Sequence, residues 1–193
     1  MNFAVFFFND KRLIVFRSVI ILFFIVSYSK GFCQEATQKD WPQFRSDSQR
    51  SAATSLKLPD QMHLKWIREF KPLEPVWPDD TRIQFDKNYH PIVIGKSLFL
   101  ASPVNDCLIS IATETGEIQW KFFADAPIRF APASRKGKLY CVSDDGYLYC
   151  LDASSGKLLW KFRGAPNDSK ILVSGRLASP WPARGAPAVD ENN

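Results

Sequence analysis

Asp144 and Asp145 are adjacent carboxylates, a residue type that can hold a divalent cation. Carboxylate oxygens are ligands that calcium prefers in proteins, so calcium binding is the chemistry this pair could support. Gly146 follows directly, however, and Asp-Gly is a strong hairpin-turn signal because glycine takes a positive φ without a Cβ clash. We therefore interpret Asp144 and Asp145 as solvated turn residues rather than as calcium ligands.

The two histidines, His63 and His90, are the next candidates for chemistry. A catalytic histidine acts with a partnered nucleophile or base, and no serine or cysteine motif accompanies either residue. No CxxC pair occurs, so a metal site of the Cys/His type lacks its ligands. We expect His90 to pack or to hydrogen-bond. From the sequence we assign no catalytic, cofactor-binding or metal-binding residue.

Cys141 and Cys150 lie on either side of the Asp-Gly turn. If Asp145 and Gly146 form a two-residue turn, the cysteines face each other in a non-hydrogen-bonded pair, where side chains are closest. Export of the protein would permit a disulfide there. A three-residue loop places Cys141 opposite Tyr149 instead, and buried free thiols are common. The sequence leaves both alternatives open.

These residues belong to a sequence repeat that must position them. Gly156 follows Gly116 by 40 residues, and Trp160 follows Trp120 by the same interval. Each unit contains short apolar runs separated by turn residues, which predicts strands. The two glycines are expected at left-handed turn positions. Both faces of the strands are apolar, as in sheets packed between neighbouring sheets.

A third unit begins near the end of the sequence. RGAPAVD at Arg184 echoes RFAPASR at Arg129. Between the second and third units, residues 164–183 (GAPNDSKILVSGRLASPWPA) are polar and contain proline, so we interpret them as a loop. We find no amphipathic helix from His90 onwards.

The repeat length indicates the architecture. Units of about 40–45 residues with four strands each are typical of propeller blades. We therefore predict an all-β fold, an incomplete β-propeller with about two blades and the start of a third over residues 90–193. Because a closed ring usually has about four to eight blades, we expect the chain to be the N-terminal part of a longer protein.

Residues 1–33 predict export. Three basic residues precede the apolar run 19–26, and small residues follow, which is the order of a signal peptide. An uncleaved anchor over 13–26 is the competing interpretation. Residues 34–89 form an irregular, Pro-rich lead-in, in which HLKWIREF (63–70) is a plausible strand.

The net charge of +5 gives no electrostatic case for nucleic-acid binding. Residues 1–33 carry four basic side chains against one acidic side chain, so the remaining chain carries only +2. A basic stripe is therefore not expected on the folded part. Contact with a membrane is expected only through the signal or anchor segment.

Two stretches, LDASSGKLLWKF (151–162) and TETGEIQWKF (113–122), resemble the pyrroloquinoline-quinone (PQQ) repeat family. The opening WPQFRSDSQRSA (41–52) is similar to the lead-in of exported members. This family includes the outer-membrane assembly factor BamB and quinoprotein dehydrogenases. The resemblance implies an eight-bladed propeller in the full protein, with Trp120 and Trp160 as docking residues between blades. Ala112 stands where the second unit has Asp152, so a turn contact is expected to be absent there.

The resemblance does not by itself imply the cofactor. Quinone-dependent dehydrogenases need a central calcium ion, a catalytic aspartate and often a disulfide of adjacent cysteines, and no Cys-Cys pair occurs here. We expect an exported, periplasmic or envelope-associated propeller that binds a protein partner as a non-catalytic scaffold. The alternative is the N-terminal part of a PQQ-dependent oxidoreductase, with PQQ and calcium held by further blades. A sugar- or polymer-binding module has no specific support in the sequence.

Overall fold

The computed structural model describes residues 40–57, 59–73, 88–173 and 175–190. The chain divides into two units, Met1–Thr37 and Gln38–Asn193, and every described residue belongs to the second. The predicted export signal and the alternative anchor lie outside the described residues. In the part of the chain that is described, no helix has the length and hydrophobicity needed to cross a membrane.

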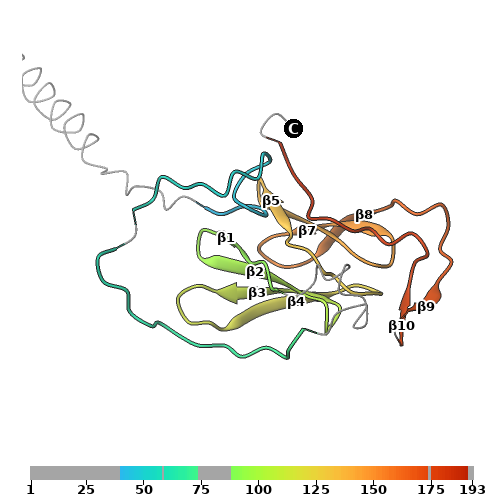
Figure 1. The fold of residues 1–193 in the computed structure, drawn as a ribbon, viewed down its shortest axis with the longest axis horizontal. Coiled ribbons are helices and arrows are strands. Elements are labelled where there is room, and N and C mark those ends of the chain that lie inside the picture. Colours follow the sequence, from blue (N-terminus) through green and yellow to red (C-terminus); the bar gives the residue numbers. More distant parts are fainter. Residues whose placement is uncertain (1–39, 58, 74–87, 174, 191–193) are drawn as a thin grey trace, which may run out of the picture. The chain divides into compact units, whose positions relative to one another are not determined.

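The described residues fold into β-strands joined by turns and irregular segments (Figure 1). The strands are β1 Ile92–Ile94, β2 Ser97–Ser102, β3 Cys107–Ala112, β4 Ile118–Phe123, β5 Ala133–Arg135, β6 Lys138–Val142, β7 Tyr147–Asp152, β8 Leu158–Arg163, β9 Ile171–Val173 and β10 Arg176–Ala178.

Two four-stranded antiparallel sheets share one topology, β1-β2-β3-β4 in blade 1 and β5-β6-β7-β8 in blade 2. The register shifts between Ser110 and Ile111 in blade 1, and between Cys150 and Leu151 in blade 2. These irregularities are 40 residues apart, so the sequence repeat is also a backbone repeat. The all-β fold with two blades is therefore confirmed.

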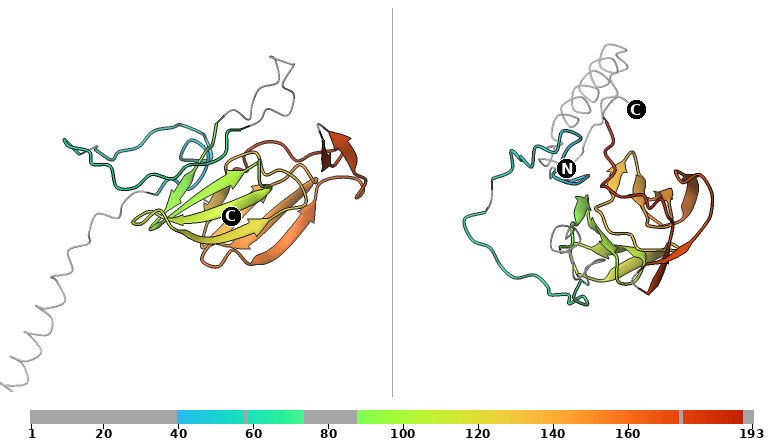
Figure 2. Two further views of the ribbon diagram at one scale, coloured as in Figure 1. Left: turned by 90° about the horizontal axis from the view of Figure 1, so that it is seen from below. Right: turned by 45° about the vertical axis from the view of Figure 1, so that its right-hand side comes forward.

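Apolar side chains from both blades form one core. The two four-stranded sheets that contribute to it lie next to each other (Figure 2). Blade 1 contributes Phe99 and Leu108, and blade 2 contributes Leu139 and Leu151, all nearly or fully buried. Burial of each such side chain contributes about 1.5–3 kcal/mol, so the blades stabilise each other.

The opposite face of blade 1 also has a cover. Cys107, Ile109 and Ile111 of β3 are buried there beneath Trp66 and Phe70 of the lead-in. Strand β8 is different, because all six of its residues are exposed. The far face of blade 2 thus has no covering element among the described residues.

The cysteine register resolves the alternative that the sequence left open. Cys141 lies opposite Tyr149, and Tyr140 lies opposite Cys150, as the three-residue loop requires. Cys141 and Cys150 are free, buried thiols. Burial raises the pKa of the Cys141 thiol well above its usual range. The disulfide hypothesis is therefore wrong for this structure.

Two segments differ from their predictions. Residues 63–70 form no strand, because no described strand pairs with their backbone. The insertion 164–183 is not only a loop, since β9 and β10 form an antiparallel hairpin within it. The apolar triplet ILV and the left-handed Gly175 (φ 77°) are the local signals for this hairpin.

Candidate functional site

The repeated tryptophan joins one blade to the next. The Trp120 ring of blade 1 lies over Gly156 of blade 2, and its Nε1 donates a hydrogen bond to the carbonyl of Ala153 (3.2 Å). A Cβ atom at position 156 would lie 2.5 Å from Trp120 Cε3. Gly156 also has φ 70°, so both the turn and the close approach require glycine. The predicted docking role of Trp120 is confirmed.

Trp66 makes the same contact one unit earlier. Its ring lies over Gly116, and its Nε1 donates to the carbonyl of Thr113 (2.8 Å). Arg68 Nε adds a hydrogen bond to the Gly116 carbonyl (2.9 Å), and Lys65 pairs with Glu114. This role of Trp66 was not predicted from the sequence, because Trp66 lacks the Lys-Phe pair that directly follows Trp120 and Trp160.

The turn contact missing from blade 1 is replaced from outside. In blade 2 the Asp152 carboxylate accepts hydrogen bonds from both hydroxyls and one amide of Ser154 and Ser155. Ala112 offers no such acceptor. The backbone hydrogen bond of the turn is kept in both blades, from the Gly116 amide to the Ala112 carbonyl and from the Gly156 amide to the Asp152 carbonyl (2.8 Å each). In blade 1 the hydrogen bond from Arg68 to the Gly116 carbonyl adds support to the turn.

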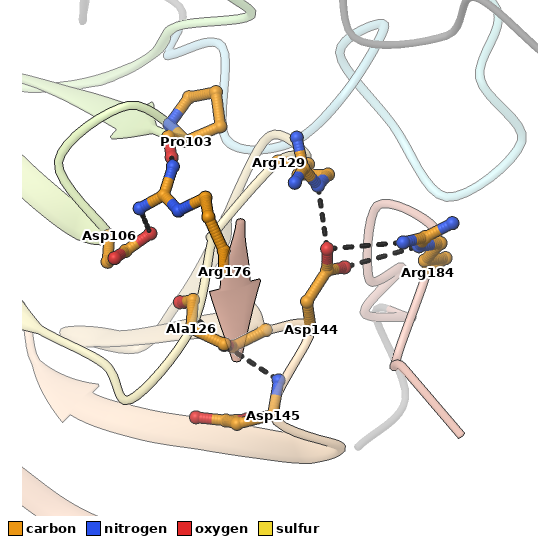
Figure 3. A network of polar contacts seen from close by, with 9 residues as sticks. Pro103, Asp106, Ala126, Arg129, Asp144, Asp145, Arg176 and Arg184 are labelled. Carbon is orange, nitrogen blue, oxygen red and sulfur yellow. Dashed lines mark hydrogen bonds and ion pairs between the residues drawn. The ribbon is translucent and has the colours of Figure 1, made fainter. Parts of the chain in front are cut away.

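A buried ion cluster links the second and third repeats. Asp144, in the β6–β7 turn, accepts a hydrogen bond from Arg129 Nε (2.7 Å) and two from Arg184 (3.2 Å each) (Figure 3). The Asp144 and Arg129 side chains are only 3% and 7% exposed. Arg129 and Arg184 occupy equivalent positions at the start of two successive repeats. The Asp144 carboxylate therefore links the first residues of the second repeat to those of the third.

Asp145 is equally occupied. Its carboxylate accepts hydrogen bonds from the Tyr149 hydroxyl (2.6 Å) and the Tyr147 amide (2.9 Å). Burial raises the pKa of Tyr149 well above its usual range, and the carboxylate of Asp145 adds to that effect. Asp144 and Asp145 are thus turn residues as predicted, but they are buried rather than solvated.

These contacts bear directly on the calcium hypothesis. Both carboxylates already accept hydrogen bonds from groups that hold them in the turn, so they do not form a calcium site. Across the described residues, no group of three or more His, Cys, Asp or Glu side chains could hold a metal ion. His90 packs edge-on against Phe44 (5.0 Å between ring centroids), as expected, and His63 is exposed.

The hairpin β9–β10 is anchored at its base. Arg176 donates to the Pro103 carbonyl (2.7 Å) and pairs with Asp106 in the β2–β3 turn of blade 1 (Figure 3). Burial raises the pKa of Asp106, and the positive charge of Arg176 opposes that shift. Leu172 and Leu177 of the hairpin are 73% and 57% exposed. An insertion after blade 2 thus presents apolar side chains from a base fixed on blade 1.

The lead-in crosses the inner edges of three repeats in three residues. Trp41 exchanges two backbone hydrogen bonds with Val93 of β1 (2.8 and 3.0 Å), and Pro42 accepts one from Ser134 of β5 (2.7 Å). The Gln43 side chain then exchanges two with the backbone of Val189 in the third repeat (2.9 and 3.3 Å). The Gln43 side-chain amide therefore pairs with the Val189 backbone as a neighbouring strand would. Nothing in the local sequence predicts this role.

A polar pocket of about 450 Å³ lies beside this crossing. Residues 46–49 of the lead-in form one wall, and Ser134 and Arg135 of β5 form another. Val189 and Asp190 of the third repeat complete the lining. We call this site the inner-edge pocket. It is formed by residues from three separate parts of the chain.

Comparison with known proteins identifies the repeat. Residues 66–183 match the family described as outer membrane protein assembly factor BamB, while curated proteins give no significant match. Similar solved structures include quinohemoprotein alcohol dehydrogenase from Comamonas testosteroni (20% identity, TM-score 0.47, 68% of this chain and 20% of that one). BamB from Moraxella catarrhalis is 17% identical (TM-score 0.34, 41% and 27%). A quinohemoprotein alcohol dehydrogenase from Pseudomonas putida is 23% identical (TM-score 0.36, 40% and 13%). The chain thus spans 13–27% of the length of these three proteins.

Proposed function

The chain belongs to the PQQ-like repeat family of the outer membrane protein assembly factor BamB, and from this premise we propose that the full-length protein is an exported, non-catalytic scaffold of the cell envelope. The propeller holds its blades rigidly and presents a loop surface to a protein partner. Rigid scaffolds with exposed connecting segments are a common way to build binding sites.

The observation that carries this proposal is that the buried carboxylates in the β6–β7 turn serve the fold. Asp144 and Asp145 are the best-placed groups for chemistry by residue type, and each is engaged in contacts that fix the turn or join repeats. Their role is therefore structural. A quinoprotein oxidoreductase would need its PQQ and calcium ligands in further blades.

The β9–β10 hairpin is the surface that we assign to the partner. Exposed apolar side chains gathered on one element are typical of protein-binding sites. Leu172 and Leu177 lie on adjacent strands as a cross-strand pair, and Arg176 holds the hairpin base on Asp106. The partner is accordingly expected to offer an apolar patch.

Cross-linking tests the scaffold role. Lys170 precedes β9, so an amine-reactive cross-linker on the full-length protein in envelope fractions should connect Lys170 to one protein. The double substitution Leu172→Asp and Leu177→Asp should abolish that cross-link, whereas Leu56→Asp, at an exposed leucine of the lead-in, should not. Retention of the cross-link in the double variant would overturn the assignment of this surface.

A cofactor titration tests the alternative. Full-length protein is titrated with PQQ and calcium and followed by absorbance and dye-linked dehydrogenase activity. We expect no saturable binding at micromolar PQQ. Saturable binding with dehydrogenase activity would replace the scaffold proposal with the oxidoreductase.

A further inference from the structure

The inner-edge pocket takes no part in blade docking or in the Asp144 cluster. Its volume of about 450 Å³ falls within the range of about 300–1,000 Å³ that is usual for small-molecule sites. It is also unlike an apolar cavity, because Pro42 and Val189 are its only aliphatic lining residues. The question is which ligand such a lining would recognise.

Two serine hydroxyl groups of the pocket are not used by the fold. Ser46 and Ser134 are 8% and 9% exposed as whole residues, and no hydrogen bond between described residues engages either side-chain hydroxyl. Neither oxygen is among the buried side-chain atoms of the described residues that lack a partner, so both hydroxyls are open to the pocket. The two hydroxyls come from opposite walls, one from the lead-in and one from β5.

The lead-in wall is held in a defined conformation. Arg45, Ser46, Arg50 and Ala52 all have positive φ, between 55° and 82°, a region that non-glycine residues rarely adopt. Backbone hydrogen bonds within the turn fix this shape, including Ala52 N to the Arg45 carbonyl (2.9 Å). A wall fixed before binding reduces the entropy lost when a ligand is bound.

The charged and polar groups of the lining indicate which kind of ligand the pocket can bind. Asp47 and Asp190 bring two carboxylates against the single guanidinium of Arg135, which disfavours an anion. The described lining offers too few metal ligands for a cation site, and Pro42 and Val189 alone give little aliphatic surface for a hydrophobic ligand. What it offers is groups that both donate and accept hydrogen bonds, namely the serine hydroxyls and the Gln49 amide, since both Asp47 oxygens already accept hydrogen bonds from Ser51.

We propose that the inner-edge pocket binds a small, uncharged, polyhydroxylated ligand, a mono- or disaccharide. Each sugar hydroxyl both donates and accepts a hydrogen bond, so it complements a lining of hydroxyl and amide groups that do the same. This site is separate from the hairpin surface assigned to a protein partner. No tryptophan is among the residues that line the pocket, so the described lining offers no indole ring for a sugar to stack on.

Sugar titration of the full chain tests the proposal. The probes are glucose, maltose and N-acetylglucosamine, with glucuronate as the anionic and glucosamine as the cationic comparison. Saturation-transfer difference NMR detects binding, and calorimetry measures the affinity. At least one neutral sugar should bind saturably below about 10 mM and more tightly than either charged probe.

Three variants locate the binding site. Ser134→Ala removes a pocket hydroxyl, and Gln49→Ala removes an exposed amide that the fold does not use. Each should weaken binding about 2- to 10-fold, the effect of one lost hydrogen bond. Ser169→Ala, in an exposed loop outside the pocket, should bind like the unaltered chain.

Three results of these experiments would contradict the proposal. The proposal is overturned if no neutral sugar binds at about 10 mM, if a charged probe binds more tightly, or if both pocket variants bind as tightly as Ser169→Ala. Circular dichroism checks that each variant is folded. If Ser134→Ala does not fold, Gln49→Ala alone decides, because its side chain is exposed.

Discussion

Trp120 and Trp160 occupy the same place in the repeat but different environments. Trp120 packs against Phe99 (5.8 Å between ring centroids), lies over Gly156 and bonds a carbonyl of the next blade. Trp160 is 43% exposed, and its ring contact is with Tyr140 of its own sheet (6.1 Å). The loss of stability on Trp120→Ala therefore reports on blade docking, and the loss on Trp160→Ala serves as the reference for a tryptophan at the same repeat position without a neighbouring blade.

The structure sets the expected magnitudes. Truncation of a core tryptophan costs about 3–5 kcal/mol, and the half-buried Trp120 belongs at the lower end, about 3 kcal/mol, of which its hydrogen bond is about 1. Trp160→Ala should cost less than about 1 kcal/mol, as at other surface positions. At about 2–4 °C per kcal/mol, the melting temperature should fall by about 6–12 °C for Trp120→Ala.

Chemical denaturation of the 193-residue chain, followed by far-UV circular dichroism, measures both free energies of unfolding. This probe does not depend on tryptophan fluorescence, which the substitutions change. If the two variants lose equal stability, Trp120 does not dock blade 1 onto blade 2, and the interpretation of the repeat interface is refuted.

Further predictions follow from matched pairs of residues. Gly156→Ala should lose at least about 2 kcal/mol more than Gly137→Ala by denaturation, because both have positive φ but only position 156 lies under a tryptophan ring; equal losses would contradict the contact. Asp144→Ala should cost about 3–5 kcal/mol in the same assay because it removes a buried carboxylate from two guanidinium groups, whereas Asp168→Ala, in an exposed pair, should cost less than about 1. The following serine hydroxyls lower the pKa of Asp152 to about 2, so its contribution to stability is complete above about pH 4 and is lost as the pH falls through about 2. A carboxyl-carbon NMR titration should give that midpoint, and a midpoint near 3.8 would show that these hydrogen bonds do not form in solution.

Much of the local fold could be predicted because its signals are short-range. The 40-residue interval between Gly116 and Gly156 predicts two equivalent left-handed turns, and the structure has φ 73° and 70° there. The Asp-Gly turn before Tyr147 was predicted for the same reason. The position of the turn could be predicted, but its length could not, and the length decides whether Cys141 faces Cys150 or Tyr149.

Residues that act across the chain were not predictable in this way. Asp144 looks like a solvated turn residue until Arg129 and Arg184 approach it from two different repeats. Gln43 carries no sign that it will pair with Val189, 146 positions later. In both cases the partner comes from a distant segment, and only packing brings the segments together.

The sequence alone determined the repeat, its strands and its glycine turns, because backbone preferences act within a few residues. The tertiary structure decided which copies of each motif are buried. Trp120 is covered by blade 2 and Trp160 is exposed, although both are followed by Lys-Phe. Burial depends on the neighbouring sheet rather than on the motif, since a blade can bury its faces only against another element.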